Sequence, residues 1–333
     1  MRKRFANWLE RQWVHIGCWH ILLMPLSWLF WLLSTCRRKA YESGTLKSYR
    51  SAVPLIVVGN IGIGGTGKTP LVIWLVEQLR LAGFSPGIIS RGYGSKSKIP
   101  RAVVEGRLPS EFGDEPVLLA RRTGCPVWVG VDRVAVQQAL LLAHPQCNVI
   151  VSDDGLQHYR MQRDIELVVV DAQRGFGNGQ LLPAGPLRES LSRLSEVDAV
   201  VYNGAGRIAP DKPDGFSMSL QGNVLCNLLN QGKTMNIADL REQVIHAVAG
   251  IGNPQRFFQQ LRSMGLSVEA HPFSDHHDFQ LEDLAFAGED VILMTEKDAV
   301  KCAAFAKPNW WYLPVVAEVD KKLADYIIRR LRK

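Results

Sequence analysis

Short apolar runs alternate with longer amphipathic stretches along most of this sequence, from about residue 53 onward. The apolar runs lack the polar alternation of half-exposed strands, and such runs are typical of parallel strands buried on both faces. The pattern therefore predicts an α/β fold in which helices cover both faces of a mostly parallel sheet. The predicted strands are 54–58, 87–90, 101–104, 126–130, 148–152, 166–170 and 198–202, and the predicted helices are 69–82, 114–123 and 132–143.

A second, smaller α/β unit is predicted after a polar, glycine-rich region. This region, residues 204–235, contains short strand-like pieces at 216–220 and 224–228 and is interpreted as the crossing between domains. A length of 333 residues also favours two domains. The expected parts are an N-terminal segment 1–50, a core domain 51–205, connecting strands 206–235 and a C-terminal domain 236–333. In the last part we expect strands 244–249, 267–271, 291–294 and 311–315, and helices 254–264, 281–286 and 320–332.

The first 50 residues follow a different pattern. Apolar residues recur at helical spacing in residues 1–16, and the stretch from Ile16 to Leu33 is mostly apolar. Five of the nine tryptophans lie in the first 31 residues, and tryptophan is enriched at membrane interfaces. The apolar run is at the short limit for crossing a bilayer, and Pro25 is expected to kink it. These features favour a monotopic or re-entrant membrane anchor, and a soluble helical hairpin packed on the core is the alternative.

The distribution of charge agrees with a membrane anchor. The net charge is +7, but the first 50 residues hold nine of the 39 basic residues and only two of the 32 acidic ones. The rest of the chain is neutral, whereas a nucleic-acid-binding protein carries its basic patch on the folded domain. We therefore expect an anionic membrane surface as partner and no nucleic acid. The six cysteines are scattered, complete no zinc pattern with histidine, and favour a reduced cytosolic compartment.

The strongest chemical signal is the stretch from Gly62 to Thr69, which fits the phosphate-binding pattern G-x-x-x-x-G-K-[ST]. It follows an expected strand and precedes an expected helix, as the motif requires. Backbone N–H groups and the helix N-terminus would surround phosphate oxygens. Lys68 would reach the outer phosphates, and the Thr69 hydroxyl would bind Mg²⁺. The residues expected to bind the nucleotide are Gly62, Gly64, Gly65, Thr66, Gly67, Lys68 and Thr69.

Two pairs of acidic residues stand at positions that suit such a site. Asp153 and Asp154 end an apolar strand, from which a carboxylate can reach the Mg²⁺ shell. Asp114 and Glu115 open a helix, where capping and the helix dipole alone could explain them. Beside a phosphate loop, however, one of these carboxylates could hold Mg²⁺ while the other takes a hydroxyl proton.

Three further segments carry polar side chains near strand ends. Arg91 follows the second strand and could pair with a phosphate. Arg188 and Glu189 end a proline-restricted loop, and rigid loops beside α/β sheets often contact substrate. The run 275–278, D-H-H-D, is too short to turn four side chains to one metal ion, so an acid–base role is expected. The alternatives are a plain turn with a solvated arginine for Arg91, a structural crossover loop for 181–189 and a solvated polar turn for 275–278.

Taken in order, these motifs resemble the lipid A 4′-kinase (tetraacyldisaccharide 4′-kinase) family, and the resemblance covers almost the whole chain. Only the phosphate loop is specific by itself, but the ordered set is highly specific. The motifs are V-G-N-I-x-x-G-G-T-G-K-T-P (58–70), S-R-G-Y-G (90–94), G-D-E-P (113–116), D-D-G-L-Q-H (153–158), L-L-P-A-G-P-L-R-E (181–189), G-I-G-N-P-x-R-F-F (250–258), F-S-D-H-H-x-F (273–279) and T-E-K-D-A-V-K (295–301).

The resemblance implies a P-loop kinase that uses ATP and Mg²⁺. Its acceptor would be the 4′-hydroxyl of a tetraacylated glucosamine disaccharide 1-phosphate, held in the inner membrane and reached from the cytoplasmic face. No protein partner is expected. By similarity, Lys68 holds the β- and γ-phosphates, and Thr69 and Glu115 bind Mg²⁺, with Asp153 or Asp154 completing its shell. Asp114 is the base, with His276 as its partner. Arg188 and Glu189 contact the sugar or its phosphate, and Arg91 is a weaker candidate at the acceptor phosphate.

Two other functions are compatible with the phosphate loop alone. One is a P-loop kinase or ATPase that acts on another lipid or small molecule. The other is a membrane-tethered nucleotide switch, which is disfavoured for GTP because the nearest approach to a guanine signature, T-E-K-D at 295–298, has Glu in place of Asn. The glycine-containing stretch 250–254 is interpreted as an interdomain hinge that closes a cleft on ATP.

Overall fold

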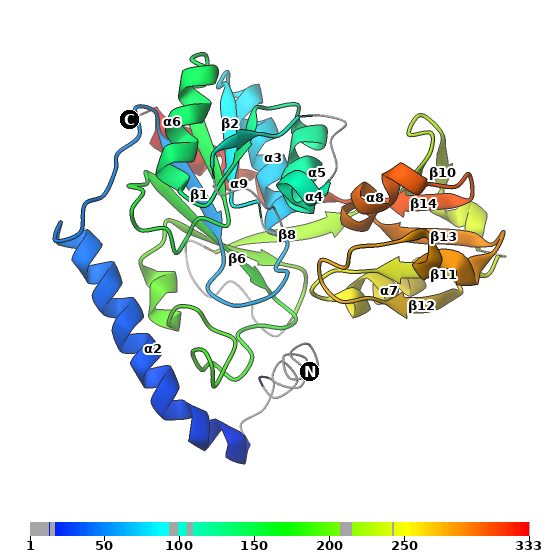
Figure 1. Ribbon diagram of the computed structural model, residues 1–333, viewed down its shortest axis with the longest axis horizontal. Coiled ribbons are helices and arrows are strands. Elements are labelled where there is room, and N and C mark those ends of the chain that lie inside the picture. Colours follow the sequence, from blue (N-terminus) through cyan, green and yellow to red (C-terminus); the bar gives the residue numbers. More distant parts are fainter. Residues whose placement is uncertain are drawn as a thin grey trace.

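The computed structural model shows two sheets, each with its own helices, and a long N-terminal helix that diverges from the larger of the two parts (Figure 1). Both sheets are mostly parallel, which confirms the expected α/β class. We call the parts around the larger and smaller sheets the core domain and the small domain. The structure describes residues 13, 17–92, 99–104, 109–206, 215–241 and 243–332.

The larger sheet places the first strand of the core domain at its centre. Its strands are β1 Leu55–Gly59, β2 Pro86–Ser90, β3 Arg101–Ala102, β4 Val127–Val129, β5 Val149–Asp153, β6 Ile165–Asp171, β7 Ala199–Asn203, β8 Gly215–Gln221 and β15 Val316–Val319. The order is β15-β8-β7-β6-β1-β5-β2-β4-β3, and only the edge strands β3 and β15 are antiparallel to their neighbours among the described strands. β1, β5 and β6 are buried at every residue, which explains why their sequences are mostly apolar.

Helices cover both faces of the larger sheet. The helices of the core domain are α3 Lys68–Leu81, α4 Pro109–Phe112, α5 Asp114–Thr123, α6 Arg133–Ala143, the short 3₁₀ helix η1 Leu191–Ser195 and α9 Lys321–Leu331. On one face Leu75 of α3, Leu119 of α5 and Leu323 of α9 share a buried cluster with the strands. On the other face Val136 and Leu140 of α6 pack against the sheet. The helices predicted at 69–82, 114–123 and 132–143 are therefore confirmed.

The small domain is a six-stranded sheet in the order β10-β9-β14-β13-β11-β12. Its strands are β9 Val224–Asn227, β10 Thr234–Asn236, β11 Ile245–Ala249, β12 Val268–Pro272, β13 Val291–Thr295 and β14 Trp310–Leu313. Its helices are η2 Ile237–Leu240, α7 Pro254–Ser263, η3 Leu281–Ala287, α8 Glu296–Cys302 and η4 Ala303–Phe305. Phe258 of α7 is buried on one face of this sheet, and Leu284 of η3 and Ala299 of α8 are buried on the other.

The C-terminal segment corrects the expected domain boundary. The sequence pattern assigns helix 320–332 to the small domain, but β15 pairs with β8 at the edge of the core sheet. The following helix α9 buries Leu323 and Ile327 in the core domain, against α3. The small domain therefore ends near residue 315. The sequence pattern did not reveal this boundary, because a strand pairing between distant segments leaves no local trace in the sequence.

The chain passes between the two domains twice. The first crossing joins β8 to β9 at residues 222–223, and the second joins β14 to β15 at residues 314–315. The two crossings touch, because a Cβ on Gly222 would lie 2.5 Å from the carbonyl oxygen of Pro314. The stretch 250–254 follows β11 inside the small domain, so the expected hinge is not where the chain crosses.

The N-terminal apolar segment forms α2, Cys18–Glu42, and the helix continues through Pro25. Most of its large apolar side chains face outward, and Trp28 and Leu22 are 63% and 68% exposed. Such exposure does not fit a helical hairpin packed on the core. By length and composition alone this helix could cross a membrane. The helical pattern expected for residues 1–16 lies outside the described residues, except Trp13.

Two contacts fasten α2 to the core domain. The Ser27 hydroxyl donates to the carbonyl of Leu181 at 2.9 Å and accepts from the backbone N–H of Ala184 at 3.0 Å. Further along the helix, Arg38 forms an ion pair with Glu196, with 2.5 Å between Nη1 and Oε2. The helix is therefore attached to the loop that contains residues 181–189.

Candidate active site

Polar side chains collect at the carboxyl ends of the core strands. Ser90, Asp153, Asp171 and Asn203 are the last residues of β2, β5, β6 and β7, and all four are buried. In parallel sheets these ends lie along one edge, where ligands bind. The phosphate loop follows the central strand β1 at the same edge, as the order of motifs predicts.

The phosphate loop has the geometry that its glycines suggest. Gly64 and Gly67 have φ angles of 107° and 93°, a left-handed conformation that favours glycine. Gly67 is the N-cap residue of α3, and no side chain caps that helix end. The first amides of α3 are therefore available to an anion. Asn203 Nδ2 donates to the carbonyl of Thr66 at 2.9 Å and supports the loop from β7.

Two cations lie beside the loop. Lys68, the first residue of α3, has its Nζ atom 3.4 Å from Oδ1 of Asp154. Arg174 reaches the loop from the segment after β6, and its Nη1 atom lies 2.6 Å from the position that a Cβ on Gly64 would occupy. The sequence reasoning did not find Arg174, although it stands three residues beyond a strand-ending Asp171.

The acids at the end of β5 form the oxygen-rich wall of the site. Asp153 is 1% exposed, and one carboxylate oxygen accepts a hydrogen bond of 3.3 Å from Ser90. Burial, with the nearby charges of Glu115 and Asp154, raises the pKa of Asp153 to about 7. Asp154 has a φ of 51°, an uncommon left-handed conformation outside glycine. It faces both Lys68 and Arg188, whose Nη1 atom lies 3.6 Å from Oδ2.

The residues at the end of β5 fit a magnesium ion. Oδ1 of Asp153 is buried without a hydrogen-bond donor among the described residues, and Oδ1 of Asp154 faces the Lys68 ammonium at 3.4 Å. A buried carboxylate oxygen without a donor is costly unless a cation balances it. Mg²⁺ prefers such carboxylate oxygens and retains several water molecules.

A second cluster joins Asp114 to His276. Both carboxylate oxygens of Asp114 lie 3.1 Å from Nδ1 of His276, which has a left-handed φ of 55°. Asp114 is 5% exposed, and burial alone would raise its pKa. The hydrogen bond from His276 and the charge of Lys297 outweigh that effect and hold the pKa of Asp114 at about 2. The same hydrogen bond raises the pKa of His276 above its ordinary value.

Lys297 completes this second cluster, and the sequence reasoning missed it as a site residue. Its Nζ atom lies 3.0 Å from Glu115, 3.7 Å from Asp114 and 3.7 Å from Asp275. Burial alone would lower the pKa of Lys297. The three carboxylates outweigh that effect, so the pKa is raised overall and the ammonium stays charged. Lys297 lies in α8, which the apolar pattern did not predict as a helix.

The second cluster exists only because the domains meet there. Asp114 and Glu115 begin α5 of the core domain, whereas His276 and Lys297 belong to the small domain. Two more contacts bring the small domain against the core edge. A Cβ on Gly252 would lie 3.0 Å from the backbone nitrogen of Gly65 in the phosphate loop. In addition, Arg256 of α7 donates to the side chain of Asn203 at 2.9 Å and pairs with Asp171 at 3.4 Å.

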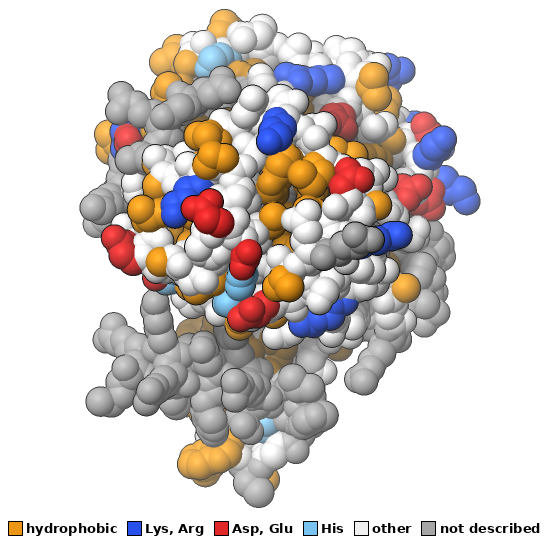
Figure 2. Space-filling view, turned by 90° about the vertical axis from the view of Figure 1, so that its right-hand side faces the viewer, with side chains coloured by type: hydrophobic (Ala, Val, Ile, Leu, Met, Phe, Trp, Pro, Cys, Tyr) orange, Lys and Arg blue, Asp and Glu red, His pale blue; other side chains and the backbone are white. Residues whose placement is uncertain are grey.

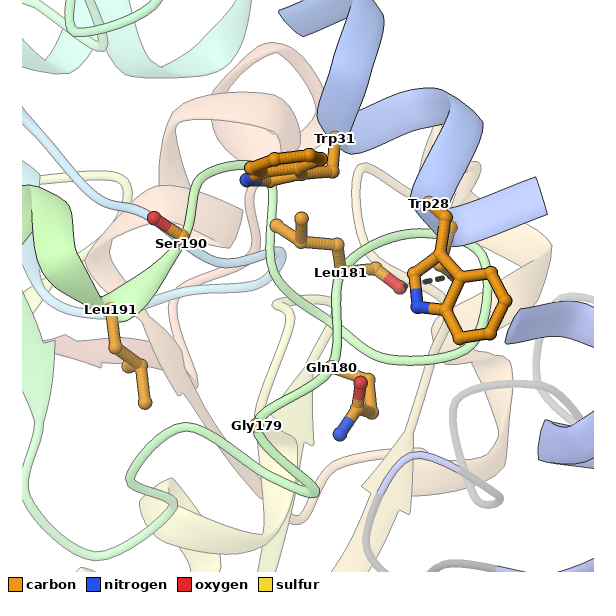
Figure 3. A pocket seen from close by; sticks show the side chains of 8 residues that line it. Trp28, Trp31, Gly179, Gln180, Leu181, Ser190 and Leu191 are labelled. Atoms are coloured by element: carbon orange, nitrogen blue, oxygen red, sulfur yellow. Dashed lines mark hydrogen bonds between the residues drawn. The ribbon is translucent and has the colours of Figure 1, made fainter. Parts of the chain in front are cut away.

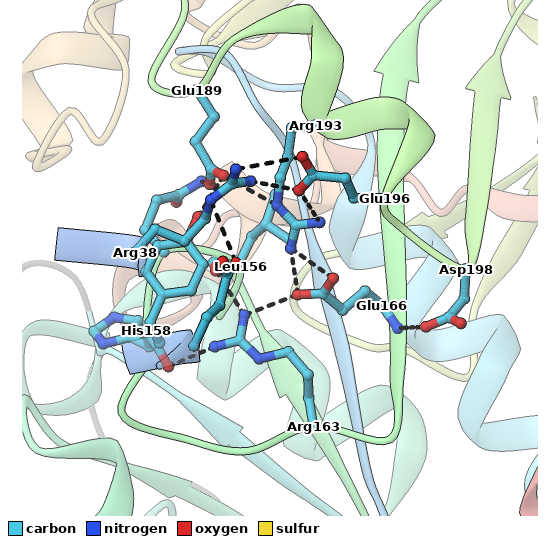
Figure 4. Close-up of polar contacts among 12 residues, drawn as sticks. Arg38, Leu156, His158, Arg163, Glu166, Glu189, Arg193, Glu196 and Asp198 are labelled. Atoms are coloured by element: carbon cyan, nitrogen blue, oxygen red, sulfur yellow. Dashed lines mark hydrogen bonds and ion pairs between the residues drawn. The ribbon is translucent and has the colours of Figure 1, made fainter. Parts of the chain in front are cut away.

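The structure brings Arg188 to the site but buries Glu189 in a polar network. Arg188 faces Asp154, as noted above. Glu189 is 8% exposed, accepts from Gln157 Nε2 at 2.6 Å and from the Tyr159 hydroxyl, and lies 3.2 Å from Arg193 (Figure 4). This geometry makes Glu189 a positioning residue for the loop, and it does not bring its carboxylate to the cleft.

Arg91 lies at the same edge, directly after β2, and its side chain is exposed. Its charge contributes to lowering the pKa of His158, after burial and Arg133. The rest of its motif, Tyr93 and Gly94, lies outside the described residues.

An apolar pocket lies between α2 and the loop that carries Arg188. Figure 3 shows Trp28 and Trp31 on α2 and Leu181 and Leu191 on the core domain around it. Its volume is about 260 Å³. Because the pocket adjoins the exposed face of α2, it offers apolar surface where the chain itself could meet a bilayer.

Fold and site together define a class: a P-loop protein whose phosphate loop, strand-end acids and Asp114 cluster suit phosphoryl transfer from a nucleotide. The family profile described as Tetraacyldisaccharide-1-P 4′-kinase matches residues 19–332 of this chain. The chain belongs to that family.

Relatives and a solved structure agree with this assignment. The tetraacyldisaccharide 4′-kinase of Methylobacillus flagellatus is 54% identical over 333 residues, covering 100% of this chain and 98% of the relative. That of Dechloromonas aromatica is 49% identical and covers 98% of each chain. A crystal structure of an "apo" form of LpxK from Aquifex aeolicus in complex with ATP has a TM-score of 0.78 at 30% identity, over 94% of this chain and 99% of that one.

These findings confirm the expected family, fold class and enzyme class. They do not favour a kinase or ATPase with an unrelated acceptor, nor a nucleotide switch. The roles of individual site residues stay predictions, and they rest on the contacts described above.

Proposed function

We propose that this chain transfers the γ-phosphoryl group of ATP to the 4′-hydroxyl of a tetraacylated glucosamine disaccharide 1-phosphate. The family and the names of its relatives support this reaction. The observation that carries it is the meeting of two built clusters at one domain junction. One is a phosphate loop with its acids, and the other is the pair formed by Asp114 and His276.

The phosphate loop holds the triphosphate in this proposal. The free amides at the start of α3 bind phosphate oxygens, and Lys68 neutralises charge on the β- and γ-phosphates. Arg174 adds a second cation to the loop, beside Gly64. Phosphoryl transfer depends mainly on positioning and on charge neutralisation, so these groups account for most of the catalysis expected from the core domain.

Four oxygen donors are proposed to hold Mg²⁺: Thr69, Glu115, Asp153 and Asp154. An ion held by these residues would supply positive charge to offset the charge that develops on the phosphate oxygens during transfer. The buried oxygen of Asp153 that has no donor among the described residues supports this assignment. Glu115 is already paired with Lys297 through Oε1 at 3.0 Å, which leaves its other oxygen for the ion.

Asp114 is proposed to take the proton of the acceptor hydroxyl. Its low pKa keeps it ionised at neutral pH, and a loose transition state needs a proton acceptor only late in the transfer. The attacking oxygen bonds to phosphorus as the bond to the leaving ADP oxygen breaks, and the hydroxyl proton passes to the Asp114 carboxylate. His276 donates a hydrogen bond to Asp114 and fixes its orientation.

The acceptor is proposed to reach the site from the cytoplasmic face of the inner membrane. The outward-facing tryptophans and leucines of α2 support a membrane contact. The apolar pocket between α2 and residues 181–191 suits part of an acyl chain. From the same loop, Arg188 faces the acids and would contact the sugar or its phosphate, while Glu189 holds that loop in place. Arg91 is a further candidate for the acceptor phosphate.

A labelling assay tests the reaction. The full-length protein in detergent micelles would be incubated with γ-labelled ATP and extracted glycolipid, and the lipid and aqueous phases would be counted separately. Label in the disaccharide lipid supports the proposal, free phosphate indicates an ATPase, and no turnover indicates a switch.

Asp114→Asn provides the test of the mechanism in the same assay. It should remove lipid labelling, whereas Asp239→Asn, on an exposed acid of η2, should not. Equal lipid labelling by wild type and Asp114→Asn would contradict the role of Asp114 and leave the acceptor identified.

A further inference from the structure

Two histidines and a glutamate meet on the small sheet, apart from the phosphate loop. His246 is the second residue of β11, and Glu269 and His271 lie two positions apart on the neighbouring strand β12. In the parallel register His246 pairs with Glu269, and Val248 pairs with His271. Since alternate residues of a strand point to the same face, all three side chains share one face of the sheet.

The possible ligand atoms of these side chains converge. Nδ1 of His246 lies 3.0 Å from Nε2 of His271. Carboxylate oxygens of Glu269 lie 3.6 Å from Nδ1 of His246 and 3.8 Å from Nε2 of His271. Two ligands of a tetrahedral zinc ion stand about 3.3 Å apart, given Zn–N bonds of roughly 2.0–2.1 Å. The three groups are therefore already close to the spacing that one ion requires, within 4.8 Å of one another.

The surroundings hold both imidazoles in place. The other ring nitrogen of His246, Nε2, lies 3.6 Å from Asp290, just before β13. Metal-bound histidines usually present their second nitrogen to a carboxylate in this way, which fixes the ring. Phe286 of η3 stacks on His271 at 3.9 Å between ring centroids and 18° between planes. His246 is only 7% exposed, so its imidazole is ordered before any ion binds.

The electrostatic environment also favours a cation. The pocket at His246 has a volume of about 470 Å³, and Glu269, Glu289 and Asp290 line it. No Lys or Arg lines this pocket within the part of the chain that the structure describes. Figure 2 faces the small domain and shows a histidine between acidic side chains on that surface.

We propose that His246, Glu269 and His271 form a binding site for Zn²⁺, with Asp290 as the carboxylate behind His246. Two imidazoles and one carboxylate suit zinc, whereas Mg²⁺ prefers oxygen ligands throughout. Three protein ligands leave one coordination position for water. The ion would tie β11 to β12. This site is separate from the phosphate loop and does not depend on the proposed reaction.

Zinc binding to the full-length protein tests the site. The protein, purified without a histidine tag and stripped with a chelator, would be titrated with Zn²⁺ alone in competition with a chromogenic chelator. One tight zinc ion per chain is expected in wild type and in Asp153→Asn, because the latter changes only the acids at β5. That ion should be lost in His271→Ala, and Asp290→Asn should bind it ~10-fold or more weakly.

Two further variants make the result decisive. His144→Ala removes a histidine that contacts Trp128 edge-on in the core domain, outside the cluster, and it should keep the zinc ion. Glu269→Gln changes an exposed side chain that cannot be essential for folding, and it should abolish the absorption bands of tetrahedral Co²⁺. If His271→Ala and Glu269→Gln bind zinc as wild type does, the three residues are only a hydrogen-bonded cluster and the proposal is wrong.

Discussion

The two clusters of the candidate active site are built in opposite ways. The phosphate loop is one continuous segment between β1 and α3, and its glycines, lysine and threonine are neighbours in sequence. The pair of Asp114 and His276 joins residues 162 positions apart, from different domains. Lys297 approaches the same pair from a third segment.

This difference separates two kinds of dependence. The loop conformation follows from local backbone geometry, so it needs only the core domain. The Asp114 cluster depends on how the small domain sits against α5, through contacts such as Arg122 with Glu296 at 2.7 Å. A perturbation of the domain junction should therefore damage proton transfer before it damages nucleotide binding.

Replacement of Lys68 should have the largest effect on turnover, because Lys68 belongs to the phosphate loop, the part of the site formed by one continuous segment. Lys68→Ala removes the cation nearest the loop, and we expect kcat to fall by ~10³-fold, as for loss of one charge-stabilising group. Steady-state lipid labelling measures this. Lys307→Ala, on an exposed lysine, is the control. Turnover within a few-fold of wild type would contradict the placement of the γ-phosphate.

Asp114→Asn should affect the assembled half alone. The amide has nearly the same shape but cannot take the proton, so kcat should fall by ~10²-fold or more. The Kd for an ATP analogue should stay within about a factor of three, since the loop is untouched. Calorimetry of analogue binding beside kinetics separates the two. Loss of nucleotide binding with little change in kcat would identify Asp114 as a metal ligand instead.

His276 and His277 offer a matched pair. The backbone of His276 has a left-handed conformation, which asparagine tolerates. His276→Asn should therefore remove the hydrogen bond to Asp114 with little backbone strain. We expect kcat to fall ~10- to 100-fold, the worth of one charge-assisted hydrogen bond. His277 pairs with Asp283 at 2.9 Å, so His277→Asn should change kcat little. The reverse ranking would sink the assigned partner of Asp114.

Gly252→Val tests the domain contact itself. A side chain there would press on Gly65 of the loop and on the docking of the small domain. We expect kcat to fall ~10-fold, with little change in thermal stability, because a misplacement of about an ångström is costly for catalysis. Gly232→Val, at an exposed glycine of the same domain whose nearest neighbouring atom lies at 3.4 Å, is the control, because neither it nor Gly252 has a left-handed backbone. Equal losses in both variants would mean that the contact is irrelevant.

The smallest effect is expected at α2. The double variant Trp28→Ser and Trp31→Ser removes exposed apolar surface beside the pocket. The apparent KM for the acylated acceptor should rise a few-fold in vesicles, while the KM for ATP should not change. An unchanged acceptor KM in membranes would show that this face does not meet the lipid. Leu142→Ser is the control, because Leu142 is exposed and lies on α6, away from α2, whereas Trp311 is buried in the small sheet and would not be a suitable control.

Local sequence patterns predicted most strands and helices of the core domain. Strands such as β1, β5 and β6 are mostly apolar because both faces are covered, and α5 begins and ends where the pattern places it. The helix expected at 320–332 is present as α9, but its assignment to the small domain was wrong, because the preceding strand β15 pairs with β8, about a hundred residues earlier in the chain. It also missed α8, a short helix whose buried face is not an apolar stripe but includes Glu296 and Asp298.

The same limit applies to the site. Strand-end acids and the loop can be found in the sequence because parallel strands end at one edge. Arg174, Lys297 and Arg256 were missed, since each is an ordinary basic residue until the fold brings it to an acid or a glycine. Glu189 was expected at the substrate because its motif is unusual, yet its carboxylate is satisfied inside the protein.

The paired crossings at Gly222 and Pro314 restrict how the small domain can move. A domain on a single linker can swivel in any direction, whereas two adjacent linkers leave mainly one swing axis, along the line that joins them. His276 and Lys297 would then travel toward or away from α5 along one arc, and arrive in a reproducible register each time the cleft shuts. If either linker were cut, the small domain would hang on a single linker and could rotate in any direction.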